Sequence, residues 1–305
     1  DGWLQYIPFA ALPDPGVPLR KTQPLIVNHE ILNLPSASTL SVLQNNLTGR
    51  QLAPKKMALL ADPVFSPADS RVRPVTSQVN QSVAENQLAC PWFSNPGFTP
   101  DRLPATRNLE HIVRSLVPPG QYTIALDFDA NLKFATGNDL SHFQIVHFAT
   151  HGMLNSENPD WSGLILSLVD VTGHSVPGFL TTLETFTLNL PAELVVLQGC
   201  QTGFGLDPFK TETGKLQSQS ITNEGLTGLT RGLMYSGARR VLVTLWNVRD
   251  DSSSELMKRF YQKHLHPKNP MPPLAALRAA QLEMRHTPNW KSPYYWAGFL
   301  FYGQP

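Results

Sequence analysis

Short apolar runs alternate with amphipathic segments along most of the chain. Between the runs, apolar side chains recur every three or four residues, as in the segment from Ser36 to Leu47 and the segment from Thr106 to Leu116. That spacing is typical of helices with one buried face. The runs that we predict as strands are 57–61, 122–126, 143–149, 194–199, 240–246 and 295–302. The alternation favours an α/β fold with a mainly parallel, six-stranded sheet and helices on both faces.

The first part of the chain departs from this pattern. Its prolines cluster between Pro8 and Pro35 and again between Pro63 and Pro104. Proline lacks a backbone N–H and interrupts regular elements, so we expect an irregular region here. The first nine residues, which do not begin with methionine, are typical of a turn and the returning strand of a hairpin. We expect its first strand to lie upstream.

Composition and charge narrow the class of protein. The chain has 305 residues, of which 41% are hydrophobic, enough for a sizeable core. Lys plus Arg total 24 against 23 Asp plus Glu, and they are scattered, which argues against a nucleic-acid partner. No apolar stretch approaches the roughly 18 to 20 residues of a membrane helix. The two cysteines are too few for a disulfide framework, so we predict a reducing compartment, the cytoplasm.

Two residues with acid–base or nucleophilic chemistry follow predicted strands directly. His151 comes just after the run 145–149, and Cys200 comes just after the run 194–199. Because parallel strands end at the same edge of a sheet, and open α/β sheets place their chemistry there, we expect these side chains to meet. A cysteine after a strand is more often a small buried apolar residue. Gly199 and Gly203, however, give a substrate backbone room to approach the sulfur.

The histidine also invites a metal-site interpretation, because His147 and His151 are four residues apart. That spacing suits two ligands on a helix, whereas these residues continue a strand, and a third and fourth ligand are not evident. We therefore predict no metal and no cofactor. His147 is better interpreted as buried in the sheet with its ring hydrogen-bonded.

Four sequence blocks carry a resemblance to a known family. They are His147-Phe-Ala-Thr-His-Gly152, Gln198-Gly-Cys-Gln-Thr-Gly203, Asn223-Glu-Gly-Leu-Thr-Gly-Leu-Thr-Arg-Gly232 and Val243-Thr-Leu-Trp-Asn-Val-Arg-Asp250. As an ordered set they resemble the signature blocks of the CHAT domain, which belongs with the caspase, separase and gingipain group of cysteine peptidases. The His151-to-Cys200 interval of 49 residues is also close to the roughly 50 of caspases.

The resemblance implies a caspase-like three-layer fold and a dyad of His151 and Cys200. It also implies an irregular, Pro-rich, pseudo-caspase-like part over residues 1–120 and a catalytic part over residues 121–305. Relatives often carry a helical-repeat region upstream, so such a region or a regulatory protein is an expected partner beside the protein substrate. The family includes the cyanobacterial HetF type, implicated in cell differentiation, and the chain is similar to it.

The chemistry predicted from the pair is peptide-bond hydrolysis, in the form of regulatory, limited cleavage of protein substrates. Cys200 would attack the scissile carbonyl, His151 would protonate the leaving amine, and the backbone N–H groups of Gly152 and Cys200 would bind the oxyanion. The alternative is an inactive caspase-like adaptor that binds protein partners. A serine hydrolase is disfavoured because no Gly-x-Ser-x-Gly elbow is present.

The sequence features that bear on substrate specificity and autoprocessing are less specific than the four blocks. The resemblance places Asp250 near a pocket that would favour Arg or Lys, with Asn247 and Glu224 as further candidates for binding substrate. Asp250 is equally interpreted as a helix N-cap, and Glu224 as a carboxylate that complements a helix dipole. The polar 204–223 loop contains Lys210 and Lys215, which makes it the candidate site of autoprocessing, or else an ordinary surface loop.

Overall fold

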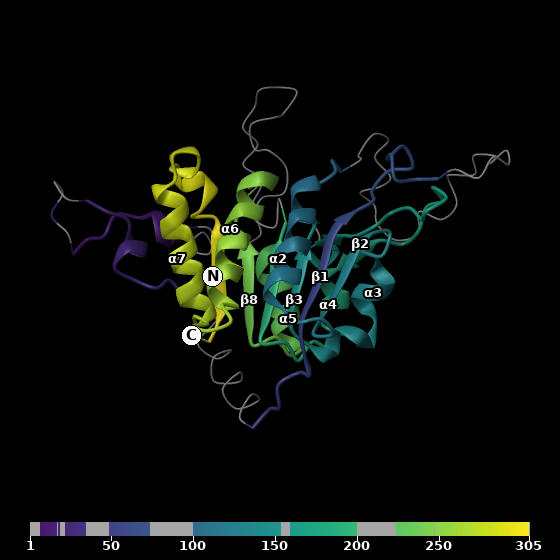
Figure 1. Cartoon of the computed structure of the whole chain (residues 1–305), viewed down its shortest axis with the longest axis horizontal. Helices are drawn as coiled ribbons and strands as arrows, with labels where there is room; N and C mark the ends of the chain where they lie inside the picture. The colour runs from purple at the N-terminus through teal and green to yellow at the C-terminus, as the bar shows by residue number, and fades with distance from the viewer. Residues whose placement is uncertain are drawn as a thin grey trace.

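The computed structural model of the chain is shown in Figure 1. It describes residues 7–16, 18, 22–34, 49–73, 100–153, 159–199, 224–246 and 248–304, and the side chains of residues 224–226 are outside this description. Its main sheet has six strands in the order β2-β1-β3-β7-β8-β9. The strands are β1 (Lys55–Pro63), β2 (Tyr122–Asp127), β3 (Phe143–Ala149), β7 (Leu194–Gln198), β8 (Arg240–Thr244) and β9 (Phe299–Gly303).

All neighbouring strands from β2 to β8 run parallel, and β9 pairs antiparallel with β8. The register aligns the ends of the two central strands, because Ala149 of β3 lies opposite Gln198 of β7. The carboxyl ends of β3 and β7 therefore meet at one edge of the sheet. β1 lies between β2 and β3, so strands from both sides of residue 120 share one sheet. The division of the chain at that residue stays a prediction.

Helices cover both faces of this sheet, which gives three layers (Figure 1). One apolar cluster joins Met57 and Leu59 of β1 to α2 (Asn108–Leu116), α6 (Asp250–His264) and α7 (Pro273–His286). The other joins Ala58 and Leu60, on the opposite face of β1, to α3 (Leu132–Thr136) and α5 (Glu224–Tyr235). Successive side chains of a strand point to opposite faces, so a strand buried on both faces needs unbroken apolar sequence. The predicted α/β class with a mainly parallel sheet is confirmed.

The last strand is shorter than the predicted run 295–302. Pro293 begins the 3-10 helix η10 (Pro293–Tyr295), and the Ser292 hydroxyl accepts a hydrogen bond from the backbone N–H of Tyr294. Proline at the first helical position fixes a helical φ angle. The aromatic residues before Phe299 therefore form a turn, and β9 begins only after it.

A second, antiparallel sheet of three strands was not predicted. It consists of β4 (His151–Met153), β5 (Gly163–Ile165) and β6 (Phe179–Thr181), followed by the short helix α4 (Thr182–Thr185). Strands of three residues are too short to show a period in the sequence. β4 follows β3 after one residue, so the chain passes from the main sheet into the small one at Thr150.

The described part of the amino-terminal region is irregular, as its prolines predicted. Ile26 is buried against α7, and Arg278 of α7 donates from Nε to the carbonyl oxygen of Ile26 at 2.8 Å. Phe9 begins a 3-10 helix rather than continuing a strand, and the helix predicted from Ser36 lies outside the described residues. The 3-10 helices among the described residues are η2 (Phe9–Ala11), η4 (Leu25–Val27), η6 (Pro104–Arg107), η7 (Asn138–His142), η8 (Pro159–Trp161), η9 (Pro288–Trp290) and η10. None of the described helices is both long and apolar enough to span a bilayer.

Candidate active site

His151 is the first residue of β4 and stands at the carboxyl edge of the main sheet. Its backbone is held on the small sheet, where His151 lies opposite Ile165 of β5. The hydroxyl group of Thr150, one residue earlier, donates to the carbonyl oxygen of Ile165. These contacts fix the sharp exit from β3 and so the direction in which the imidazole leaves the sheet.

The imidazole of His151 has a defined partner and a defined tautomer. Its Nε2 lies 2.6 Å from the backbone carbonyl oxygen of Asp101, which can only accept a hydrogen bond, so Nε2 carries the proton. The ring also packs against Phe65, with 5.3 Å between ring centroids. Burial lowers the pKa of His151, and the Asp101 carbonyl opposes this shift. The ring is therefore neutral at pH 7, with Nδ1 unprotonated and able to accept a proton.

Gly199, the residue before Cys200, packs directly on the backbone around His151. The N–H of Thr150 donates to the carbonyl oxygen of Gln198 at 3.0 Å, and the Thr244 hydroxyl donates to the carbonyl oxygen of Gly199. A Cβ atom added to Gly199 would lie 2.7 Å from the Thr150 carbonyl oxygen, which only glycine avoids. Cys200 and the 204–223 loop with Lys210 and Lys215 lie outside the described residues, so their placement stays a prediction.

Gly152 lies in β4 beside the end of β7. Its backbone nitrogen is 3.0 Å from the position of the Cβ atom that Gly199 lacks. The N–H group predicted to bind an oxyanion is therefore adjacent to the residue that precedes Cys200. Of the other predicted contacts, Glu224 is the first residue of α5 with its side chain undescribed, and Asn247 is undescribed.

Asp250 begins α6, but it does not cap that helix. The N-cap residue is Arg249, without a side-chain cap, and Asp250 instead accepts a hydrogen bond from the backbone N–H of Ala105 at 2.7 Å. Its other oxygen, Oδ1, is buried without a partner among the described residues. Burial raises the pKa of the carboxyl. Gly199 and Asp250 border the same cavity of about 10 Å³, room for about one water molecule.

A buried polar cluster lies beneath this edge. His147 has no exposed surface, and its Nδ1 forms a hydrogen bond with the Tyr261 hydroxyl at 2.9 Å, as the strand pattern led us to expect. Gln198 donates from Nε2 to the hydroxyl oxygen of Ser253 at 3.0 Å. Burial lowers the pKa of His147 to about 3, opposed by the side chain of Gln198. This histidine is a neutral structural group.

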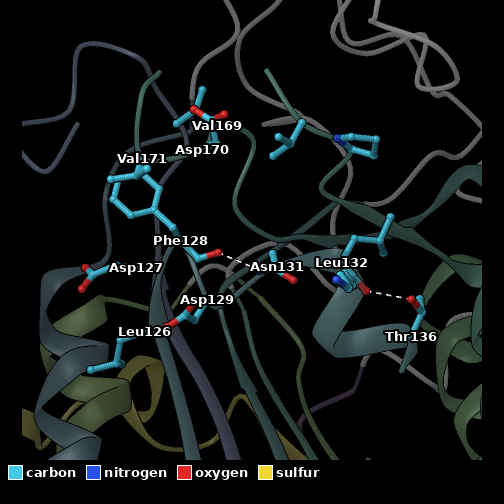
Figure 2. A pocket seen from close by; sticks show the side chains of 13 residues that line it. Leu126, Asp127, Phe128, Asp129, Asn131, Leu132, Thr136, Val169, Asp170 and Val171 are labelled. Atoms are coloured by element: carbon cyan, nitrogen blue, oxygen red, sulfur yellow. Dashed lines mark hydrogen bonds between the residues drawn. The ribbon is translucent and has the colours of Figure 1, made fainter. Parts of the chain in front are cut away.

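A larger cavity of about 830 Å³ lies at the end of β2 and does not include His151, Gly199 or Asp250 among its lining residues. Figure 2 shows Phe128, Leu132 and Val171 around it, with the Asn131 side chain bonded to the Phe128 carbonyl. Its polar wall includes Asp127, which is paired with Arg71 at 2.7 Å. Within the described ranges, no group of three or more His, Cys, Asp or Glu is arranged to hold a metal ion.

The sheet and its histidine-bearing edge define an α/β protein with one candidate site at the carboxyl ends of β3 and β7. The chain belongs to the CHAT domain family, which matches residues 1–304. The family assignment made from the sequence blocks is therefore confirmed.

Curated relatives cover only part of the chain. Tetratricopeptide repeat protein 28 of Homo sapiens is 31% identical over 124 residues, which are 41% of this chain, and the Mus musculus protein has the same identity and coverage. The chain spans about 4% of the length of these relatives.

Solved structures of the separase–securin complex of Saccharomyces cerevisiae are also similar. In two of them the match covers 90% of this chain and 14% of the matched chain in the complex. The TM-scores are 0.47 and 0.44, and the sequence identities are 12% and 13%.

Proposed function

We propose that the protein is a cysteine endopeptidase in which Cys200 is the nucleophile and His151 the general acid and base. Membership in the CHAT family supports a peptidase-related fold. The observation that carries the proposal is the contact between Gly199 and the backbone of residues 150–152. Gly199 is covalently joined to the proposed nucleophile, so its contact with the backbone around His151 supports the pairing of the two residues.

The state of His151 suits the chemistry. Nδ1 of the neutral ring takes the thiol proton as the sulfur attacks the scissile carbonyl carbon, and it then gives that proton to the departing amine. A water molecule attacks the acyl-enzyme and loses its proton to Nδ1, which returns it to the sulfur as the acid leaves. The N–H groups of Gly152 and Cys200 would bind the oxyanion in both steps.

We further propose that substrates are cleaved after Arg or Lys. The support is Asp250, whose Oδ1 lacks a partner within the described part of the chain and which lies beside Gly199. A buried carboxylate without a counter-charge gains from a cationic partner. Asn247 and Glu224 remain candidate contacts in the same pocket. A peptide library that shows preference for Asp or for bulky apolar residues contradicts this specificity.

We also propose that the protein cleaves its own chain. The 204–223 loop follows the nucleophile and holds Lys210 and Lys215, which match the proposed basic preference. Mass spectrometry of the wild-type protein and of Cys200→Ala tests this: cleavage in the loop only in the wild type supports it, and an intact loop in both rules it out. An upstream helical-repeat partner and the HetF type stay predictions of the sequence resemblance.

The deciding experiment compares wild type, Cys200→Ala and His151→Ala on a denatured and a native proteome, with new amino termini read by mass spectrometry. Cys90→Ala is the matched control, because it removes the other cysteine and leaves the proposed dyad. We expect cleavage by the wild type and Cys90→Ala only. Cleavage that survives Cys200→Ala removes the mechanism, and absence of cleavage by the wild type favours the adaptor alternative.

A further inference from the structure

The carbonyl group that holds His151 belongs to a segment anchored elsewhere. Asp101 is fifty residues before His151 and begins the 101–107 segment, which leads through η6 into α2. Because the contact is made by a backbone oxygen, the orientation of the His151 ring depends on where this segment lies. The identity of the Asp101 side chain does not enter the contact.

Asp62 anchors the segment from the sheet. It lies within β1, where the pairing with β2 is irregular between Ala61 and Pro63, and it is fully buried and has a φ angle of 48°. Arg102 binds it with two parallel hydrogen bonds, from Nε to Oδ1 at 2.9 Å and from Nη2 to Oδ2 at 2.7 Å. The backbone N–H of Asp62 donates to the Thr106 hydroxyl oxygen at 3.0 Å. Two-point binding of a planar guanidinium by a carboxylate fixes orientation as well as distance.

Arg102 follows Asp101 directly, so the clamp on its side chain acts next to the carbonyl that binds His151. The chain of contacts runs from β1 through Asp62 and Arg102 to Asp101, and then to the imidazole at the end of β3. We infer that Asp62 and Arg102 form a positioning pair, which holds the Asp101 carbonyl against Nε2 and thereby fixes the tautomer and direction of His151. The effect of this pair on catalysis rests on the proposed function, whereas its effect on the orientation and tautomer of the His151 ring does not.

Two other arginines make the inference testable. Arg71 lies 3.1 Å and Arg107 3.0 Å from the Asp62 carboxylate, so the buried charge keeps cationic partners when Arg102 is removed. The Arg102 side chain is itself 38% exposed. Replacing it therefore loosens the segment beside Asp101 without leaving an uncompensated buried charge, which is the usual reason why breaking such a pair unfolds a protein.

The test compares Arg102→Ala and Arg102→Lys with the wild type, and Arg114→Ala is the matched control. Arg114 lies at the surface of α2, where it donates from Nε to Oε1 of Glu110 at 2.9 Å and from Nη1 to the Tyr122 hydroxyl at 3.1 Å. The ring nitrogens of His151 are followed by ¹⁵N NMR, with thermal unfolding measured in parallel. We expect one tautomer, protonated at Nε2, in the wild type and Arg114→Ala, a mixture in Arg102→Ala, and an intermediate result in Arg102→Lys.

Turnover of a peptide substrate gives the second readout. We expect kcat to fall about 10- to 100-fold in Arg102→Ala with a smaller change in KM, because misplacing a catalytic group by about 1 Å costs rate rather than binding. A folded Arg102→Ala protein with an unchanged His151 tautomer overturns the inference. If Arg102→Ala does not fold, unchanged ring signals in Arg102→Lys overturn it instead. An inactive wild type with the expected ring signals refutes only the proposed function.

Discussion

Gly199 lies so close to the backbone of Thr150 that a residue with a side chain cannot occupy position 199. A Cβ atom at position 199 would be 2.7 Å from the Thr150 carbonyl oxygen and 3.0 Å from the Gly152 nitrogen. Real Cβ atoms do not approach backbone to 2.7 Å. Gly152 is fixed by strand pairing, and Thr150 is fixed by hydrogen bonds to the carbonyl oxygens of Gln198 and Ile165. The absence of a side chain at this position therefore allows the ends of β3 and β7 to touch where the candidate dyad is expected.

Gly199→Ala is expected to weaken both the fold and the site. The added methyl group has to push apart backbone atoms, and overpacking of this kind typically costs about 1 to 3 kcal/mol of unfolding free energy. Urea unfolding measures the loss, and the rate of alkylation at Cys200 reports the site. Gly228→Ala is the control, because the contact of its Cβ atom would be with the side-chain methyl group of Thr182 at 3.1 Å and not with backbone of another segment. Equal stability of Gly199→Ala and wild type would contradict the packing argument.

His147 is expected to make the protein sensitive to acid. Burial lowers the pKa of His147 from 6.5 to about 3, so between these pH values the unfolded chain binds a proton at this residue and the folded chain does not. Stability is therefore lost as the pH drops below 6.5, until the folded ring itself protonates near pH 3. Linkage gives a loss of about 2 kcal/mol between pH 7 and pH 5.

Urea unfolding at both pH values, for wild type and His147→Gln, measures this contribution. The variant should lose less stability between pH 7 and pH 5, while His111→Gln, on the exposed face of α2, should behave as the wild type does. The same loss in His147→Gln and wild type would show that other groups cause the acid sensitivity.

The sequence predicted the frame of the site but not all of its contacts. Five apolar runs match strands because buried parallel strands need continuous apolar sequence, and the strand ends bring Gly199 to His151. The Asp101 carbonyl was missed because every residue has a carbonyl group, so a backbone acceptor fifty residues away leaves no signature in the sequence. Arg102 and Asp62 were missed for a related reason, since they are forty residues apart and their pairing depends on the fold.

His151 is expected to titrate below its ordinary range when the thiol is absent. Burial lowers its pKa, so in Cys200→Ala the imidazole should stay neutral until the pH falls below 6.5. NMR titration of the ring in that variant measures the pKa without the charge of a thiolate. A midpoint above 6.5 would mean that the ring is solvated or faces an acidic group, and would contradict the described surroundings.

Asp250→Asn is expected to separate stability from specificity. Burial raises the pKa of this carboxyl, so the folded state holds a proton more readily than the unfolded state, and ionisation costs stability as the pH rises above the ordinary carboxyl pKa. An amide oxygen can still accept the hydrogen bond from Ala105, so the neutral variant should be at least as stable as the wild type at pH 7.

If Asp250 binds basic side chains, kcat/KM for Arg and Lys peptides should fall while kcat/KM for peptides with neutral residues changes little. Asp251→Asn, whose carboxylate pairs with Arg249 at the surface, is the control. An equal fall for all peptides in Asp250→Asn would assign the residue to holding Ala105 and the 101–107 segment instead.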